Sequence, residues 1–446
     1  MGNLEYRPEP FLYYDGEGIA RHLEKMAARG WRLEKAGPFF WRYRRAEPAG
    51  VHYAVTYFPE ASEYNPYPTD SQEEFYDYCR EVGWNLVTEW DRMQVFSTER
   101  AHPIPIETDE AARVRVIHRA MLRRFLPASL LSLGLEGLIA VLSIAAILQN
   151  PVANLCRPAG LLLTLAWVLV GLSTFLNLAG YLVWYLRARK AAEAEERPAE
   201  EAGWFRALTI AVAALGLMAV LAALGTAVSA GTPWLGVYAV LMSAVCIGLV
   251  AAVRAFMRRR GVERGENRKL TLAVAAALLL VINIIPRAVI GGQPAELHIV
   301  DRAALPLVLA DLQQGEPGAF TYSWETSRSP LVTYGAGWQR GVTVGGPVQL
   351  EYQVVEVHLP ALFDLCRNSY LSRYDNRYSA ITELHFRPLN DPAWGADEVW
   401  QVWDNEGPWP YYLACKNGRI VWLMADDFLT PEQTDIAAEH LFGGTI

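Results

Sequence analysis

The sequence predicts a three-part protein: an α+β domain at the N-terminus, an all-α transmembrane bundle of five helices, and an α+β domain at the C-terminus. Apolar residues make up 52% of the 446-residue chain, but they concentrate in its middle, whereas both ends are polar and aromatic. A Gly-Trp-x-Leu pattern also occurs twice near the N-terminus, which indicates an internal duplication.

The first domain, residues 8–100, is predicted to contain one unit twice. Gly30-Trp31-Arg32-Leu33 recurs as Gly83-Trp84-Asn85-Leu86. Each copy follows a segment with helical spacing of apolar residues and precedes one with the two-residue alternation of a strand. We expect the helices at 18–29 and 71–81, with further strands ahead of them at 11–14 and 52–58. The unit is therefore β-α-β-β, and a duplicated sheet with both helices on one face would bury the two halves.

Local signals mark the ends of the two helices. Each helix is expected to end at a glycine, Gly30 or Gly83, where a left-handed backbone terminates a helix without a Cβ clash. Ser71 and Glu74 have the spacing of a capping box, which would satisfy two backbone donors at the start of the second helix.

The strand after the first repeat carries alternating aromatic and basic residues. Trp41, Arg42, Tyr43 and Arg44 are interpreted as a strand with a solvated face, and they are also our candidate surface for a protein partner. Trp31 and Trp84 lie at helix-to-strand junctions, so we expect them in the hydrophobic core.

These residues resemble a bacterial family, the domain of unknown function numbered 2812. The resemblance covers roughly residues 8–100 and rests on Met26-Ala27-Ala28-Arg29-Gly30-Trp31-Arg32-Leu33, Tyr53-Ala54-Val55-Thr56-Tyr57 and Gly83-Trp84. It implies a domain that often precedes membrane spans. It also hints at regulation, because members frequently occur beside PadR-like transcriptional regulators. No catalytic residues are implied.

A basic juxtamembrane helix at 107–125 is followed by five apolar runs, each long enough for the roughly 20 residues that cross a bilayer core. The predicted spans are 126–148, 159–186, 207–229, 233–253 and 270–290. Lys and Arg cluster at 113–124, 187–190 and 254–269, whereas the alternate loops carry almost none. Because basic residues near span ends resist translocation, we expect a multi-pass cell-membrane protein with a cytoplasmic N-terminus and an extracytoplasmic C-terminus.

Glu136 is a carboxyl group near the centre of the first span. Placing it there costs on the order of 3 kcal/mol, so it should have a partner. At ~1.5 Å per residue it lies at about the same depth as Asn177 of the second span, with Ser173 and Thr174 one turn away. We expect a protonated Glu136 that hydrogen-bonds to the Asn177 group. This cluster is interpreted either as a polar clamp between helices or as part of a proton or ion path.

The region 293–446 is predicted to be an extracytoplasmic α+β domain. Strands are expected at 350–358, 382–386 and 399–403, with a hairpin at 411–425 around Asn417-Gly418, a strong turn signal. A helix is expected at 359–372, and Thr430-Pro431-Glu432-Gln433 predicts a capped terminal helix.

Cysteine and tryptophan content leaves two questions open in this region. An oxidising exterior permits a disulfide between Cys366 and Cys415, but the sequence does not decide between a disulfide and two free thiols. The tryptophans are explained by core and membrane contacts or by stacking on an extracytoplasmic ligand such as a sugar.

No catalytic, cofactor-binding or metal-binding motif occurs: HExxH, paired Cys-x-x-Cys, G-x-S-x-G, a Walker loop and a dinucleotide fingerprint are all missing from the sequence. Neither soluble part carries a basic patch with interleaved aromatics, so nucleic acid is not an expected partner, whereas the bilayer is. The leading hypothesis is a non-enzymatic sensor or regulator that meets a protein partner in the cytoplasm. The alternatives are an accessory subunit of a transporter or envelope complex, and an intramembrane enzyme or ion-translocating protein that uses Glu136.

Overall fold

The computed structural model divides the chain into two compact units. One holds Met1–Leu138, Ala166–Met218 and Thr232–Ala288, and the other holds Ile139–Leu165, Ala219–Gly231 and Val289–Ile446. The structure describes residues 4–9, 11–37, 40–107, 109–194, 203–229, 233–291, 299–312, 319–343, 346–373 and 384–444. Each unit is considered separately below.

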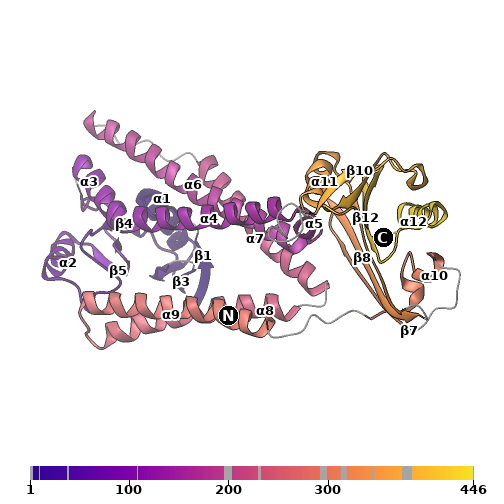
Figure 1. Cartoon of the computed structure of the whole chain (residues 1–446). Coiled ribbons are helices and arrows are strands. Elements are labelled where there is room, and N and C mark those ends of the chain that lie inside the picture. Colours follow the sequence, from indigo (N-terminus) through magenta and orange to yellow (C-terminus); the bar gives the residue numbers. More distant parts are fainter. Residues whose placement is uncertain are drawn as a thin grey trace. The chain divides into compact units, whose positions relative to one another are not determined.

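The N-terminal domain contains the predicted β-α-β-β unit twice (Figure 1). The first copy is β1 (Leu4–Pro8), α1 (Gly16–Ala28), β2 (Trp31–Lys35) and β3 (Phe40–Arg45), and the second is β4 (His52–Tyr57), α2 (Asp70–Val82), β5 (Asn85–Trp90) and β6 (Met93–Thr98). The two copies form separate antiparallel sheets of equivalent order, β1-β3-β2 and β4-β6-β5. The prediction of one duplicated sheet was therefore wrong in its pairing, although the repeated unit is confirmed.

The first strand lies earlier than predicted, because the segment 11–14 forms a turn rather than a strand. Its aromatic residues are used in packing: the ring of Tyr14 lies 5.5 Å from that of Tyr181 and 5.2 Å from that of Trp184, centroid to centroid. The aromatic residues of this segment favoured a strand in the prediction. In the structure their side chains pack against residues that are distant in the sequence, and the backbone is not paired in a sheet.

The glycine helix ends are confirmed, and the capping box is not. Gly30 follows α1 with φ +82°, and Gly83 caps α2 with φ +101°, both in the left-handed region. Helix α2 begins at Asp70, one residue earlier than predicted, with Thr69 as N-cap and no side-chain capping bond. Ser71 is therefore inside the helix, where it cannot act as the cap residue of a box.

The core of the domain joins both copies. Ile19, Leu23 and Met26 of α1 are buried against Tyr53 and Val55 of β4, so the first helix packs on a strand of the second copy. Trp84 is buried, as predicted, in a smaller cluster with Cys79, Phe96 and Ile106, and Trp31 is half-buried against the main core. The helix α3 (Glu110–Ala120) adds Ile117 and Ala120 to the same cluster.

Helix α3 continues through a π-helical turn, Met121–Phe125, into α4 (Leu126–Gln149). The remaining apolar helices are α6 (Pro158–Glu193), α7 (Gly203–Ser229), α8 (Pro233–Arg259) and α9 (Arg264–Gly291). Within the described residues three helices are long and apolar enough to cross a membrane: Leu126–Gln149, Pro158–Glu193 and Trp204–Thr226. These three suggest a membrane protein. The predicted five-helix bundle is not supported, because 233–253 and 270–290, although helical, include many side chains outside the described part of the chain.

The C-terminal region is mostly β. A seven-stranded antiparallel sheet has the order β10-β11-β12-β13-β9-β8-β7. Its strands are β7 (Ala319–Arg328), β8 (Val332–Thr343), β9 (Gly346–Val357), β10 (His385–Pro388), β11 (Glu398–Trp403), β12 (Pro408–Lys416) and β13 (Arg419–Ala425). Its helices are α10 (Leu309–Leu312), α11 (Phe363–Leu371) and α12 (Pro431–Gly443), and α5 (Pro151–Leu155), the short helix between α4 and α6, belongs to the same compact unit.

Both faces of this sheet are covered (Figure 1). Tyr352, Val354 and Leu423 pack under α10 and α12, whereas Val355, Leu413 and Trp422 pack under α5 and α11. The two-residue alternation of β9, β12 and β13 therefore supplies two separate apolar clusters.

Most of the local signals in this region are confirmed. The hairpin turns at Asn417-Gly418, with φ +49° and +79°, and Thr430 with Gln433 forms the predicted capping box of α12. Predicted strands at 350–358 and 399–403 correspond to β9 and β11, and part of the strand predicted at 382–386 lies outside the described residues. Strands β7 and β8 were not predicted.

Candidate functional site

Glu136 of α4 is 7% exposed and has a nearer partner than the one predicted. Ser132, one turn earlier on the same helix, donates its hydroxyl to Oε1 of Glu136 at 2.7 Å. Gly171 of α6 lies beside Glu136, and a Cβ placed there would make an ordinary van der Waals contact, 3.6 Å from the Cβ of Glu136. The second carboxyl oxygen of Glu136 is buried without a hydrogen-bond partner among the described residues.

The predicted bond from Glu136 to the Asn177 group is not present. Asn177 donates its amide to the carbonyl of Ser173 at 3.1 Å, and the hydroxyl of Ser173 points to the carbonyl of Thr209 on α7 at 3.5 Å. Thr174 makes no hydrogen bond with a described residue. Asn177 and Ser173 thus donate to backbone carbonyls of α6 and α7, as polar residues at contacts between helices commonly do. The carboxyl group of Glu136 is bonded by a residue of its own helix, α4.

Cys366 and Cys415 are free thiols, so the disulfide considered from the sequence does not form. They are 0% and 2% exposed and belong to one apolar cluster that also contains Cys156. Burial raises the pKa of Cys366 to about 11 and that of Cys415 to about 12. Both thiols are therefore protonated and packed as small apolar groups.

The residues predicted to form a partner strip on β3 do not share one face of the sheet. Trp41 and Tyr43 are 2% and 0% exposed and form part of the core, so they cannot meet a partner in this conformation. Arg42 and Arg44 point to the opposite face, where both pair with Glu34 of β2. Neighbouring residues of a strand face opposite sides of the sheet, so one strand cannot present all four residues to a partner.

Two aromatic residues outside the predicted strip lie on that opposite face, Tyr6 of β1 and Phe40 at the start of β3. The register places Tyr6 beside Arg42, Leu4 beside Arg44, and Pro8 beside Phe40. Tyr6 is 64% exposed and Phe40 is 60% exposed. We call this face, formed by Leu4, Tyr6, Phe40, Arg42 and Arg44, the outer sheet face.

A first group of contacts connects the N-terminal domain to helix α6. Nδ1 of His118 on α3 lies 2.6 Å from the hydroxyl oxygen of Tyr181, and the imidazole stacks on Tyr185 with 4.0 Å between ring centroids. Burial lowers the pKa of His118, which favours the neutral ring that stacks there. Tyr14 adds its own ring contacts with Tyr181 and Trp184.

A second group of contacts connects the domain to the α8–α9 hairpin. Arg254 pairs with Glu63, and Arg258 donates to Glu89 at 2.9 Å. Asn267, which is fully buried, donates its amide to the carbonyl of Tyr64 at 3.2 Å. Glu89 is itself oriented by the hydroxyl of Tyr76 at 2.9 Å. Charged and amide groups from both sides are thus matched individually, which distinguishes this contact from incidental apolar packing.

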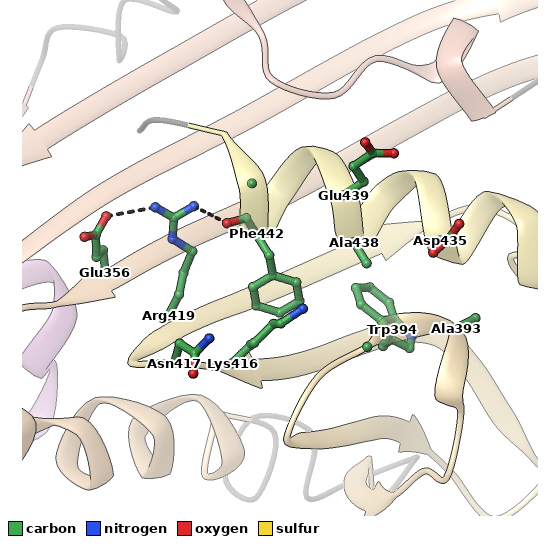
Figure 2. Close-up of a pocket in the computed structure, with 12 residues that line it drawn as sticks. Glu356, Ala393, Trp394, Lys416, Asn417, Arg419, Asp435, Ala438, Glu439 and Phe442 are labelled. Carbon is green, nitrogen blue, oxygen red and sulfur yellow. Dashed lines mark hydrogen bonds and ion pairs between the residues drawn. The ribbon is translucent and has the colours of Figure 1, made fainter.

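Two of the cavities lined by described residues of the C-terminal unit differ in their electrostatics. The first, of about 540 Å³, lies beside the end of α12, and Figure 2 shows its arginine directed at other protein groups. Arg419 pairs with Glu356 at 3.0 Å and donates to the carbonyls of Phe442 at 2.8 Å and Gly444 at 2.7 Å. Its charge therefore caps the C-terminus of α12 and is not available to a ligand. The second cavity, of about 490 Å³, is lined by α5, β7, β8, β9 and the end of α11.

No group of three or more His, Cys, Asp or Glu side chains suited to a metal ion occurs among the residues whose positions are described. The sequence missed the two groups of contacts with α6 and α8–α9. Sequence reasoning assigned the basic residues near 254–269 to the membrane surface, and no local pattern indicates that two of them meet Glu63 and Glu89.

An α+β module of two β-α-β-β units is followed by apolar helices, and within the described residues three of these are long and apolar enough to cross a membrane. This arrangement defines the class: a small α+β domain attached to apolar helices that suggest a membrane protein. The N-terminal part of the chain, residues 15–130, matches the family described as "Protein of unknown function (DUF2812)". The match confirms the resemblance found from the Gly-Trp segments, and it extends through α3 into the start of α4. Comparisons with curated proteins and with solved structures gave no match.

Proposed function

We propose that this protein is a non-enzymatic membrane regulator in which the state of the membrane helices controls a partner-binding domain. The supporting observation is that the N-terminal domain contacts α6 and the α8–α9 hairpin through specific polar and aromatic pairs and is continuous with α4 through α3. A shift of any of these helices would change contacts that hold the domain. The family match adds no activity of its own.

The proposal includes a topology. The chain crosses the membrane several times, α8 and α9 included, with the N-terminal domain in the cytoplasm and the C-terminal domain outside. Supporting this orientation, basic residues at 113–124, 187–190 and 254–269 lie at span ends on one side. The C-terminal domain then senses an extracytoplasmic ligand or the state of the envelope.

The outer sheet face is the proposed surface for the cytoplasmic protein partner. It offers two largely exposed aromatic rings, those of Tyr6 and Phe40, beside two guanidinium groups that share a single carboxylate, Glu34. Aromatic and arginine side chains are the residue types that most often dominate binding energy at interfaces. The excess positive charge favours a partner whose surface is acidic at this point.

Partner binding is tested by a photo-cross-linking amino acid placed at Tyr6 of the full chain in living cells. We expect a defined adduct from Tyr6 and none from Tyr78, a control tyrosine on α2 that is 50% exposed. Arg44→Glu should reduce the Tyr6 adduct by about tenfold, because it reverses one of the charges that meet the partner. Adducts are quantified by gel and identified by mass spectrometry.

Sensing is tested by removing residues 293–446 from the same strain. Regulation predicts that the Tyr6 adduct changes in amount when the C-terminal domain is lost. An adduct of unchanged amount would contradict the sensing half of the proposal, and equal adducts from Tyr6 and Tyr78 would contradict the surface.

One observation favours a second candidate, an intramembrane enzyme or ion-translocating protein: the buried carboxyl oxygen of Glu136 has no hydrogen-bond partner among the described residues. Under the main proposal Glu136→Gln should preserve the Tyr6 adduct within about twofold, since glutamine retains an oxygen that accepts from Ser132. Ser132→Ala serves as the control that removes this hydrogen bond alone. Loss of all phenotypes in Glu136→Gln, with normal protein levels and an unaffected Ser132→Ala, would instead favour proton chemistry at Glu136.

A further inference from the structure

The cavity of about 490 Å³ in the C-terminal unit has an unusual position in the chain. One wall is the connector between α4 and α6, from Gln149 to Arg157, which includes α5. The other wall is the sheet face of β7, β8 and β9 together with Arg373, just after α11. Because α4 and α6 are both suited to cross a membrane, the short connector between their ends lies at the level of the lipid headgroups.

The connector is fixed against the sheet rather than loosely placed. Val152, Leu155 and Cys156 are 7%, 4% and 3% exposed and pack into the apolar cluster under α11. The hydroxyl of Ser327 on β7 donates to the carbonyl oxygen of Cys156 at 3.0 Å. The cavity wall is therefore a defined surface built from both segments.

Two arginines of this cavity have no anionic partner within the described part of the chain. Neither Arg157 nor Arg373 forms an ion pair there. The guanidinium of Arg373 lies over the rings of Trp422 and Tyr370, at 4.9 Å and 6.0 Å from their centroids. Stacking orients the group through its face, and the N–H donors in the plane of the guanidinium have no side-chain hydrogen-bond partner among the described residues. Arg419 in the neighbouring cavity, by contrast, donates to Glu356 and to backbone carbonyls.

Uncharged donors complete the lining. The hydroxyl of Tyr370 donates to Oε1 of Gln353 at 2.8 Å, so the amide NH₂ of Gln353 remains a donor, and the hydroxyl of Tyr334 makes no hydrogen bond with described residues. Glu325 is the one carboxylate among the lining residues, so the charge of the cavity is positive. Two guanidinium groups with phenol and amide donors are the groups that proteins use to bind phosphate esters.

We propose that this cavity binds the phosphate group of a membrane-lipid headgroup. Its position at the ends of α4 and α6 brings the two arginines to the depth where such phosphates lie, and basic pockets at that depth bind anionic headgroups. The bound headgroup joins the α4–α6 connector to the sheet of the C-terminal domain. The lipid composition of the membrane thereby becomes an input to that domain, independent of any ligand in the surrounding solution.

The test uses the purified, delipidated full chain in detergent and counts bound lipid by native mass spectrometry. The probes are short-chain phosphatidylglycerol and diacylglycerol with the same chains, which lacks the phosphate. Wild type should bind the first and not the second. The double variant Arg157→Gln/Arg373→Gln should lose affinity by about tenfold or more, because charge-assisted hydrogen bonds to phosphate are lost.

Two control variants and two soluble competitors identify the binding site and the ligand. Arg340→Gln is the matched control, since Arg340 also stacks on a tryptophan, Trp338, at 4.8 Å but does not line the cavity. Glu325→Gln should raise the affinity several-fold, because it removes the one carboxylate of the lining. Binding that is equal for both lipids, or unchanged in the double variant, would overturn the proposal. Competition by inorganic phosphate or glycerol phosphate at the lipid's own concentration would overturn the lipid as the source and assign a soluble phosphate ester.

Discussion

Replacing Gly30 with alanine is expected to lower the free energy of unfolding of the N-terminal domain by about 2–3 kcal/mol. Gly30 has φ +82°, a left-handed conformation that costs a residue with a Cβ about 1–2 kcal/mol. A Cβ at this position would also lie 2.8 Å from the carbonyl oxygen of Ala46, which belongs to the backbone and cannot rotate away. The substitution therefore strains the junction between α1 and β2 and the chain that returns beside it.

Cys79 provides the measurement. It is fully buried, and burial raises the pKa of its thiol to about 12, so a thiol reagent at neutral pH labels it only after the domain opens. In a full chain with Cys79 as its one cysteine, Gly30→Ala should lower the midpoint of thermal labelling by roughly 5–10 °C. Gly50→Ala is the control, because nothing lies within 4 Å of its added Cβ. Equal midpoints for the two variants would contradict this account of the α1–β2 junction.

Local patterns predicted the N-terminal fold well where a single residue or a short period determines the conformation. Gly30 and Gly83 end their helices for a reason that is contained in the residue itself, the missing Cβ. The alternation of β3 likewise placed Arg42 and Arg44 on the solvated face. The alternation did not predict that Tyr6 lies beside Arg42, because Tyr6 belongs to β1. The pairing of two strands cannot be deduced from the sequence of either strand alone.

Glycines explain why the strand β8 was not predicted from the sequence. Gly335, Gly337 and Gly341 interrupt β8, and glycine within a strand usually lowers its predicted stability. In the fold Gly337 leaves room for the ring of Tyr352, which is fully buried and whose hydroxyl donates to the carbonyl of Leu307 at 3.0 Å. A close approach of this kind depends on the partner strand, so a single strand's composition cannot reveal it.

The polar cluster in the apolar helices was predicted incompletely for a related reason. Depth along a helix correctly identified Glu136 as a residue that needs a partner, and a polar group at equal depth on another span was the natural candidate. A serine one turn away on the same helix satisfies one oxygen at lower cost, because neighbours four residues apart already face each other. The position of Glu136 along its helix therefore indicated that it needs a hydrogen-bond partner, but it did not indicate which residue that partner is.

Reversing the charge of Arg254 is the second large effect that we expect. Arg254→Glu places a carboxylate against Glu63, whose side chain is 17% exposed, and removes a charge-assisted hydrogen bond. We expect the contact between the N-terminal domain and the α8–α9 hairpin to lose about 2–3 kcal/mol, with faster hydrogen exchange in residues 59–68 and 260–268. Arg259→Glu, the same charge change on the same helix at an exposed residue with no ion pair to a described residue, should leave exchange unaltered.

A double variant that exchanges the two charged residues tests whether the effect comes from this specific ion pair or from the change in charge alone. Glu63→Arg combined with Arg254→Glu restores opposite charges, so exchange should return most of the way to the wild-type rate, and salt should accelerate exchange in wild type and in the exchanged pair. If the proposed regulation operates through this contact, the Tyr6 adduct should change in Arg254→Glu and recover in the exchanged pair. An adduct that stays constant while exchange changes would mean that the contact holds the domain in place without controlling its partner. Regulation would then have to act through the contacts of His118 and Tyr14 with α6.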